Sequence, residues 1–321
     1  MRAAIVGVSG AFLNDAERWL LAEHPPAGVI LFGRNVIGRA QLAALVAELR
    51  VLLRPGAVLM VDQEGGRVQR LRPPHWPGHP SCAAVGASGV RAAWLQGALI
   101  GAEAEAAGFD VVCAPVLDLR QPGASDVVGD RAFGTDPAHV AACGAAMAEG
   151  LLAAGVQPVA KHAPGHGRAT VDSHLALPEV VGLDAAELAA FADMGRIPWL
   201  MTAHVVYRGV DDLPATLSPV ILGGLIRGRM GFVGLLVSDD LHMRALSGSP
   251  ASLACTALDA GCDIALFCSG SIEPTRAVLE RVPQLTAAAV TRMAAARGMA
   301  ERARTALDID AMRAERDALL R

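Results

Sequence analysis

Short apolar segments alternate with amphipathic segments along most of the chain, and this alternation constrains the fold more than any other feature. The apolar segments have the composition of buried strands and occupy residues 3–8, 28–32, 58–61, 110–114, 158–160, 199–202, 235–238 and 264–268. Helical patterns stand at residues 14–23, 39–53, 91–107, 137–154, 185–194, 220–229, 249–260 and 273–280. Strands of this kind imply a parallel sheet with right-handed crossovers. About eight such units in one uninterrupted chain predict an α/β fold, a TIM-type (β/α)8 barrel.

The length of 321 residues is about that of two average domains, but α/β barrels often use this length as one. No linker or low-complexity segment interrupts the alternation. We therefore expect residues 1–321 to form a single barrel domain. Residues 285–321 should be a helical C-terminal extension that packs outside the barrel.

Composition and charge exclude several classes of partner. The formal net charge is −4, with acidic and basic residues spread along the chain, so nucleic acid is not an expected partner. The longest uncharged run, residues 73–90, contains four prolines and cannot span a bilayer, which argues against a membrane partner. The six cysteines form no CxxC pair, and most lie in apolar runs. Buried free thiols indicate a reducing compartment, so we expect a cytoplasmic protein.

Polar side chains follow the expected strands at the point where each strand ends. In a barrel, the carboxyl ends of all strands open on the same mouth, where barrel enzymes place their chemistry. We therefore expect six side chains to converge there: Asp62, Asp118, Lys161, His162, His204 and Asp239.

The segment from Lys161 to His174, KHAPGHGRATVDSH, is the strongest candidate for a functional site. Its proline and glycines deny it helical and strand hydrogen bonding, so we expect a loop that leaves the carboxyl end of a strand. A polar surface loop is the alternative. Surface loops seldom combine a Lys-His pair, a glycine-flanked histidine and an Asp-Ser-His triplet, which favours the functional interpretation.

The stretch DQEGGRVQR (62–70) places an acid at a strand end and an arginine beyond a Gly-Gly turn. Asp62 could accept hydrogen bonds from vicinal hydroxyls while Arg70 donates to the same ligand. An Asp-Arg ion pair that stabilises the turn is an equally good interpretation. Arg131, in GDRAFGTDP (129–137), is likewise either a ligand contact or a loop clamp.

Two acidic residues follow the expected strand at residues 235–238. Successive side chains of a strand point to opposite faces, so only one of the pair can face the barrel mouth. Asp239 is nearer the strand and is the better candidate, whereas Asp240 should brace the following segment. His204, two residues beyond another strand, is expected to orient a ligand or to brace a neighbouring acid.

Metal and nucleotide chemistry find little support. His162, His166, His174 and Asp239 would be a sensible set of ligands, but His162 and His166 share a face only on a helix, which Pro164 excludes. The cysteines add no metal-binding spacing, and neither nucleotide-binding glycine motif is present. We expect no metal and no cofactor.

Taken together, the motifs resemble the family-3 glycoside hydrolases, and most of all the single-domain bacterial cytoplasmic β-N-acetylglucosaminidases of peptidoglycan recycling. The matching stretches occur in the family's order: GVILFGRN (28–35), DQEGGRVQR (62–70), APVLDL (114–119), GDRAFGTDP (129–137), KHAPGHG with DSH (161–174), TAHVVY (202–207) and GFVGLLVSDDL (231–241). The KH-x-PGHG element followed by DSH is highly specific.

The resemblance implies an eight-unit barrel that removes a terminal β-linked N-acetylglucosamine from a peptidoglycan-derived muropeptide with retained configuration. It implies Asp239 as the nucleophile and His174 as the general acid/base, with Asp172 tuning the histidine. It also implies five residues that hold the sugar: Asp62, Arg70, Arg131, Lys161 and His162. We expect a monomer. Retaining glycosidases normally use two carboxylates. A histidine can also give and take a proton near neutral pH.

Two departures and two rival functions remain. Ala163 stands where the family usually has an aromatic residue, and the segment 179–199 is several residues shorter than is typical. The nearest rival function is phosphorolysis, because a histidine leaves room for anionic phosphate that a glutamate would repel. A catalytically silent sugar-binding barrel is the rival from another class.

Overall fold

A computed structural model describes residues 1–192, 195 and 197–321 of the chain, and it contains an eight-stranded parallel sheet. The strands are β1 (Arg2–Gly7), β2 (Pro26–Leu31), β3 (Val58–Val61), β6 (Val111–Val112), β7 (Gln157–Ala163), β9 (Trp199–Thr202), β11 (Leu235–Val237) and β12 (Ala265–Phe267). Their spatial order is β11-β9-β7-β6-β3-β2-β1-β12. A parallel bridge between Val237 and Ile264 joins the two edges. The predicted TIM-type (β/α)8 barrel is confirmed.

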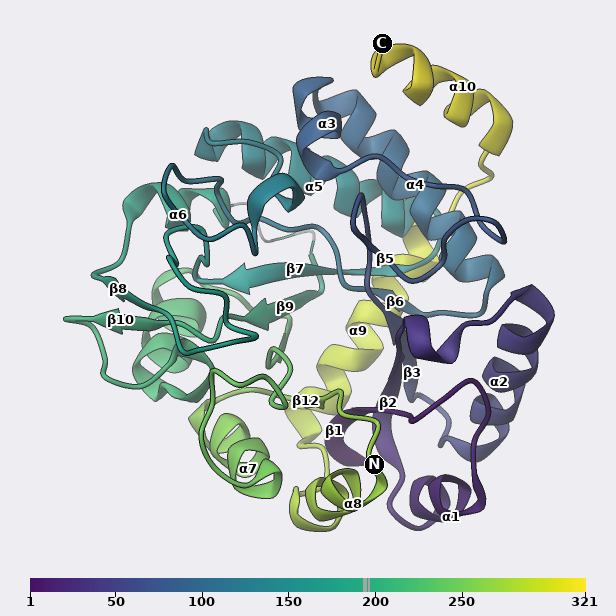
Figure 1. The fold of residues 1–321 in the computed structure, drawn as a ribbon, viewed down its shortest axis with the longest axis vertical. Coiled ribbons are helices and arrows are strands. Elements are labelled where there is room, and N and C mark those ends of the chain that lie inside the picture. The colour runs from purple at the N-terminus through teal and green to yellow at the C-terminus, as the bar shows by residue number, and fades with distance from the viewer. Residues whose placement is uncertain (193–194, 196) are drawn as a thin grey trace.

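Helices surround the strands (Figure 1). They are α1 (Asp15–Glu23), α2 (Arg39–Leu52), α3 (Cys82–Ala87), α4 (Val90–Ala106), α5 (Pro137–Ala153), α6 (Ala185–Ala190), a π-helix at Val220–Arg229, α7 (Pro250–Ala260) and α8 (Ile272–Arg281). Local sequence signals begin several of them. Asn14 and Glu17 form a capping box at α1, and Asp136 caps α5 ahead of Pro137. The helix expected at residues 185–194 is described only to Ala190, and Met194 lies outside the described residues.

Two apolar layers hold the barrel together. Ile5, Ile30, Met60 and Trp199 belong to a buried cluster inside the sheet, and a larger cluster fills the space between the sheet and the helices. Both faces of each strand are therefore buried, which explains why the strands read as continuous apolar runs rather than as alternating ones.

The C-terminal helices take two positions. Helix α9 (Ala287–Ala303) lies at the amino ends of the strands, where Arg292 donates to Asp263 ahead of β12 and Arg297 donates to the Gly56 carbonyl ahead of β3. Helix α10 (Ile309–Leu319) packs outside α4, through contacts that include the Arg91–Glu315 ion pair (Figure 1). Both leave the carboxyl ends of the strands open. Among the described residues, no helix is long and apolar enough to cross a bilayer.

One expectation at the site is wrong. Strand β7 does not end at residue 160 but continues to Ala163, so Lys161 and His162 are strand residues and not loop residues. Lys161 bridges to Val116, and Ala163 pairs with Thr202 of β9. Neighbouring strands thus supply the backbone partners that the local sequence gives no reason to expect.

Candidate active site

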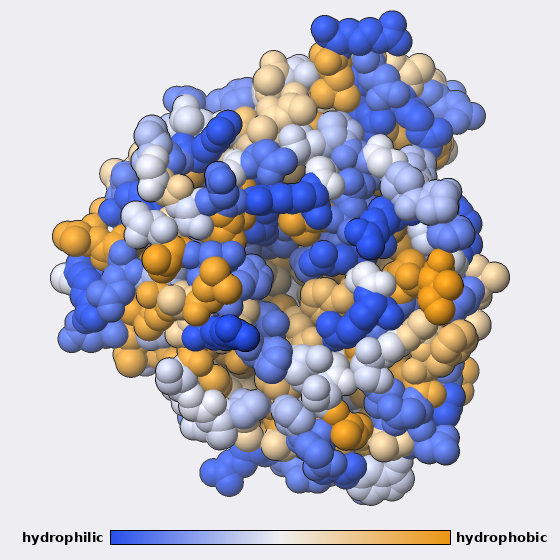
Figure 2. Space-filling view, viewed as in Figure 1, coloured by the Kyte–Doolittle hydropathy of each residue, from blue (hydrophilic) through white to orange (hydrophobic). Residues whose placement is uncertain are grey.

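A cavity opens at the carboxyl ends of the strands, and hydrophilic side chains border the hollow near the middle of this face (Figure 2). Its polar lining consists of Asp62, Glu64, Arg70, Arg131, Lys161, His162, His166, Ser173, His174, Asp239 and Asp240. Its apolar lining includes Ile30, Phe32, Met201, Met243, Leu266 and Cys268. Seven of the eight residues predicted to act in the site line this cavity, and the eighth, Asp172, contacts His174. Asp118 and His204, which were expected at the mouth, are instead buried beside it.

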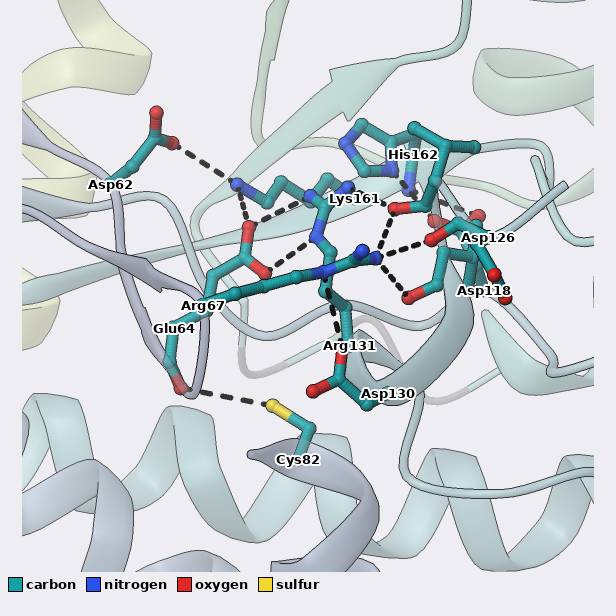
Figure 3. Close-up of polar contacts among 12 residues, drawn as sticks. Asp62, Glu64, Arg67, Cys82, Asp118, Asp126, Asp130, Arg131, Lys161 and His162 are labelled. Atoms are coloured by element: carbon teal, nitrogen blue, oxygen red, sulfur yellow. Dashed lines mark hydrogen bonds and ion pairs between the residues drawn. The ribbon is translucent and has the colours of Figure 1, made fainter. Parts of the chain in front are cut away.

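Five charged side chains form a continuous row along one wall of the cavity. Arg70 donates to Asp62 at 2.9 Å, and the Lys161 ammonium lies between Asp62 at 3.1 Å and Glu64 at 2.6 Å. Glu64 also accepts two hydrogen bonds from Arg131, each 2.8 Å long. Figure 3 shows Glu64 between the two cations. The signs alternate along the row, which ends in an arginine on each side.

The free-energy cost of burying these five charges is offset by the ion pairs that they form with one another. Burial alone would raise the pKa of the Asp62 and Glu64 carboxyls, but the adjacent cations outweigh it, so the pKa of Glu64 falls to about 2 and that of Asp62 is also lowered. Burial would lower the pKa of the Lys161 ammonium, yet the two carboxylates raise it. All the members therefore stay charged at neutral pH. Two carboxylates between three cations present hydrogen-bond acceptors and donors that suit sugar hydroxyls.

His162 is held in a fixed orientation by Asp118. The ring Nδ1 donates to Asp118 Oδ2 at 2.6 Å, which leaves Nε2 as the nitrogen that a ligand can reach. Asp118 is fully buried and also accepts from the backbone nitrogen of His166 at 2.7 Å. Asp118 therefore acts below the cavity as the support of His162.

Asp239 and Asp240 both line the cavity, so the expectation that only one of them would face it is wrong, but their contacts differ. Asp239 lines the cavity and accepts from the Asp240 backbone nitrogen at 2.8 Å. Burial would raise the pKa of Asp239, but the imidazoles of His162 and His204 outweigh it and hold that pKa below its ordinary value. Asp240 accepts from the backbone nitrogens of His242 and Cys268, so it braces the loop, as predicted. Burial raises the pKa of Asp240.

Asp172 and His174 form a hydrogen-bonded pair at the rim of the cavity. The His174 ring Nδ1 lies 2.7 Å from Asp172 Oδ1, and the His174 backbone nitrogen donates to the same oxygen at 2.8 Å. Burial would raise the pKa of Asp172, but these two contacts lower it. The His174 side chain is 62% exposed. The pair is thus assembled by contacts within its own turn, and its imidazole remains open to solvent.

His204 supports the nucleophile candidate from behind. Its Nε2 donates to the Asp240 carbonyl oxygen at 3.0 Å, and its Nδ1 lies 2.8 Å from Thr216 Oγ1. The side chain is fully buried. His204 therefore holds the backbone next to Asp239, and its role toward the neighbouring acids stays a prediction.

Two residues of this cluster were missed by sequence reasoning as site residues. Glu64 lies in the short strand β4 (Gln63–Gly65), which pairs with β5 (Val68–Gln69), and only 1% of its surface is exposed. The alternation of side chains beyond Asp62 could have indicated that Glu64 points the same way. His166 was counted in the candidate segment 161–174 and weighed as a metal ligand, but it was given no role in the sugar site. Within the part of the chain that the structure describes, no group of three or more His, Cys, Asp or Glu side chains could hold a metal ion.

Comparison with known protein families gives a match over most of the chain. Residues 4–303 match the glycosyl hydrolase family 3 N-terminal domain. The chain belongs to glycoside hydrolase family 3. The predicted family and the prediction of a glycoside hydrolase are therefore confirmed.

Individual relatives refine the comparison. The chain is 40% identical to a β-hexosaminidase of Methylococcus capsulatus over 316 residues, which cover 94% of this chain and 92% of that protein. Among solved structures, NagZ from Neisseria gonorrhoeae in complex with N-trifluoroacetyl-D-glucosamine superposes with a TM-score of 0.86 at 31% identity, covering 100% of this chain and 98% of NagZ. A family-3 β-N-acetylglucosaminidase from Paenibacillus gives a TM-score of 0.85 at 31% identity, covering 99% of this chain and 66% of that one.

Proposed function

We propose that this glycoside hydrolase is a β-N-acetylhexosaminidase that removes terminal β-linked N-acetylglucosamine from peptidoglycan-derived muropeptides with retained configuration. The β-hexosaminidase relatives and the N-acylated glucosamine held by the gonococcal protein support the sugar. One observation carries the chemistry: Asp239 and the Asp172–His174 pair line or border the same cavity, beside a row of charges suited to hydroxyl groups. Six free cysteines agree with the proposed cytoplasmic location.

In the first step, Asp239 attacks the anomeric carbon and the bond to the leaving oxygen breaks. His174, as the imidazolium, gives its Nε2 proton to that oxygen. Asp172 accepts a hydrogen bond from Nδ1–H, and its negative charge stabilises the imidazolium. Asp62, Arg70, Arg131, Lys161 and His162 fix the sugar hydroxyls.

In the second step, neutral His174 takes a proton from water, and the resulting hydroxide equivalent attacks the anomeric carbon and displaces Asp239. Two inversions give net retention. The lowered pKa of Asp239 suits this role, because the group must be ionised before attack and a good leaving group afterwards. All the proton transfers are supplied by protein side chains and water.

The substrate class is tested with a panel of aryl glycosides and a GlcNAc-containing muropeptide. We expect the N-acetylglucosaminide to be turned over by far the fastest. Equal turnover of the glucoside would refute the substrate class, and no turnover of any glycoside would favour the silent sugar-binding barrel. Size-exclusion chromatography with light scattering tests the expected monomer.

Phosphorolysis is the second candidate, because the exposed imidazole at the rim does not repel an anion as a carboxylate would. Reactions with and without inorganic phosphate separate the two functions. We expect free N-acetylglucosamine in both; sugar 1-phosphate as the main product would overturn the hydrolase.

The roles of Asp239 and His174 are separated by the leaving group. His174→Ala should reduce cleavage of a natural disaccharide far more than glycosylation from an activated aryl substrate, because a sugar alkoxide needs a proton to leave and a nitrophenolate needs almost none. A glycosyl-enzyme should then accumulate, and azide should restore turnover and yield the β-glycosyl azide. Asp239→Ala should abolish both reactions. Equal losses for both substrates in His174→Ala, with no adduct on Asp239, would contradict the assignment.

A further inference from the structure

Ser173 stands between the two residues of the acid/base pair but has the opposite environment. The side chains of Asp172 and His174 are 33% and 62% exposed, whereas only 2% of the Ser173 surface is accessible. Ser173 also lines the cavity. The middle residue of an otherwise exposed loop therefore points toward the interior of the protein.

Both hydrogen bonds described between residues 170–177 and the site around them use Ser173. Its hydroxyl lies 3.1 Å from His166 Nε2, and its carbonyl oxygen accepts from the Ala245 backbone nitrogen at 3.2 Å. The other hydrogen bonds of the pair lie within the turn, where Asp172 oxygens accept from the backbone nitrogens of residues 174–176 and contact the His174 ring. Ala245 belongs to the loop that follows Asp239, so Ser173 connects the loop of the acid/base pair to the loop of the nucleophile.

The direction of the His166–Ser173 bond follows from the burial of the ring. His166 Nδ1 is buried without a hydrogen-bond partner. Burial lowers the pKa of His166, so the ring is neutral at pH 7 and carries one hydrogen. A buried N–H without an acceptor is costly, so the hydrogen belongs on Nε2, which donates to Ser173 Oγ. His166 is itself held by its backbone bond to Asp118.

We propose that Ser173, held by His166, is a positioning residue that fixes the Asp172–His174 pair at the rim of the cavity. The proposal rests on the acid/base role of His174 given above. Asp118 then supports two groups: it orients His162 directly, and it orients the acid/base pair through His166 and Ser173. The sugar-binding row contains none of these contacts, so binding of the sugar should not depend on Ser173.

The test is the kinetics of Ser173→Ala on two substrates, a natural disaccharide and an activated aryl N-acetylglucosaminide. We expect kcat for the disaccharide to fall between about 10-fold and about 100-fold, because a misplaced acid loses most of its effect. The glycosylation rate with the aryl substrate should fall less than about 3-fold, since its leaving group needs little acid. The Ki of free N-acetylglucosamine and the melting temperature should stay close to those of the unaltered protein.

Two further variants complete the test. Ser125→Ala removes a hydroxyl from the neighbouring loop, where among the described residues it accepts from the Val127 nitrogen, and should leave the leaving-group dependence unchanged. His166→Asn should reproduce the effect of Ser173→Ala, and the double variant should be no worse than either single one, because both remove the same bond.

The failure of this proposal is distinguishable from failure of the proposed function. If His174→Ala shows no leaving-group dependence, the acid/base assignment is wrong. If His174→Ala shows it but Ser173→Ala slows both substrates equally, or slows neither, Ser173 is not a positioning residue. Additive losses in the double variant would also overturn the proposal.

Discussion

At the scale of single residues, the ionisation of Asp239 depends on two imidazoles, of which only one lines the cavity. His162 lines the cavity and His204 is buried behind it, yet both lower the pKa of Asp239 against the effect of burial. The nucleophile candidate is thus kept ionised by two imidazoles from two different strand ends. This arrangement makes the acid side of the pH profile sensitive to a residue outside the sugar site.

We predict that His204→Gln moves the acid limb of kcat/KM to higher pH by up to about one unit. The sign follows from the charge: removal of a neighbouring imidazole raises the pKa of Asp239, so a higher pH is needed to ionise it. The measurement is the pH dependence of kcat/KM for an aryl N-acetylglucosaminide. His242→Gln, at an exposed ring packed against Phe267, is the matched control. An acid limb at the same pH in both variants would remove His204 from this role.

At the scale of elements, the segment after β7 has a rigid base and an exposed tip. Arg168 donates to Glu187 of α6 at 2.8 Å and to the carbonyl oxygens of Val181 and Gly182, and the Tyr207 hydroxyl donates to the Gly165 carbonyl. The tip carries His174. A fixed base lets the imidazole meet a substrate without rearrangement of the strand that holds Lys161 and His162.

Gly167 tests this rigid base. A Cβ at this position would lie 2.2 Å from the Leu119 carbonyl oxygen, so backbone must move to accept it. We predict that Gly167→Ala lowers the free energy of unfolding by about 1–3 kcal/mol and reduces activity, measured by urea denaturation and by kcat. Gly10→Ala, where a Cβ meets nothing within 4 Å, should cost far less. Equal stability of the two variants would show that the loop tolerates the shift.

At the scale of the whole molecule, the charged row joins segments that are far apart in the sequence. Glu64 follows β3, Arg131 lies ahead of α5 and Lys161 belongs to β7, so each ion pair exists only in the closed barrel. Stability should therefore depend on the ionisation of the two buried carboxyls.

We predict that the free energy of unfolding falls by a few kcal/mol between about pH 5 and pH 2. The pKa values of Glu64 and Asp62 are lowered in the folded state, so their contribution is complete above the unfolded values near 4 and is lost as pH falls toward the folded ones. Urea denaturation across this range measures it. Glu64→Gln should be less stable at pH 7 and should show a weaker dependence, whereas the exposed Glu301→Gln should follow the unaltered protein. An unchanged slope in Glu64→Gln would contradict the linkage.

Much of the architecture is determined locally and could be predicted. Strands such as β3 and β9 follow from short apolar runs that begin shortly after a proline and end at a polar residue, and α1 and α5 begin at capping residues whose side chains bond within one turn. The segment containing His174 is recognisable because its proline, glycines and Asp-Ser-His triplet are local features.

Other features of the site are determined by the tertiary structure, because they depend on partners that are distant in the sequence. Lys161 and His162 became strand residues only because β9 and the loop after β6 supply hydrogen-bond partners. Glu64 carries no local sign that it will pair with Arg131, which lies 67 residues away. The sequence alone therefore determined the barrel and the chemical groups at its mouth. Tertiary structure decided how those groups are paired, oriented and charged, since electrostatic and hydrogen-bond energies depend on distances that only the closed barrel sets.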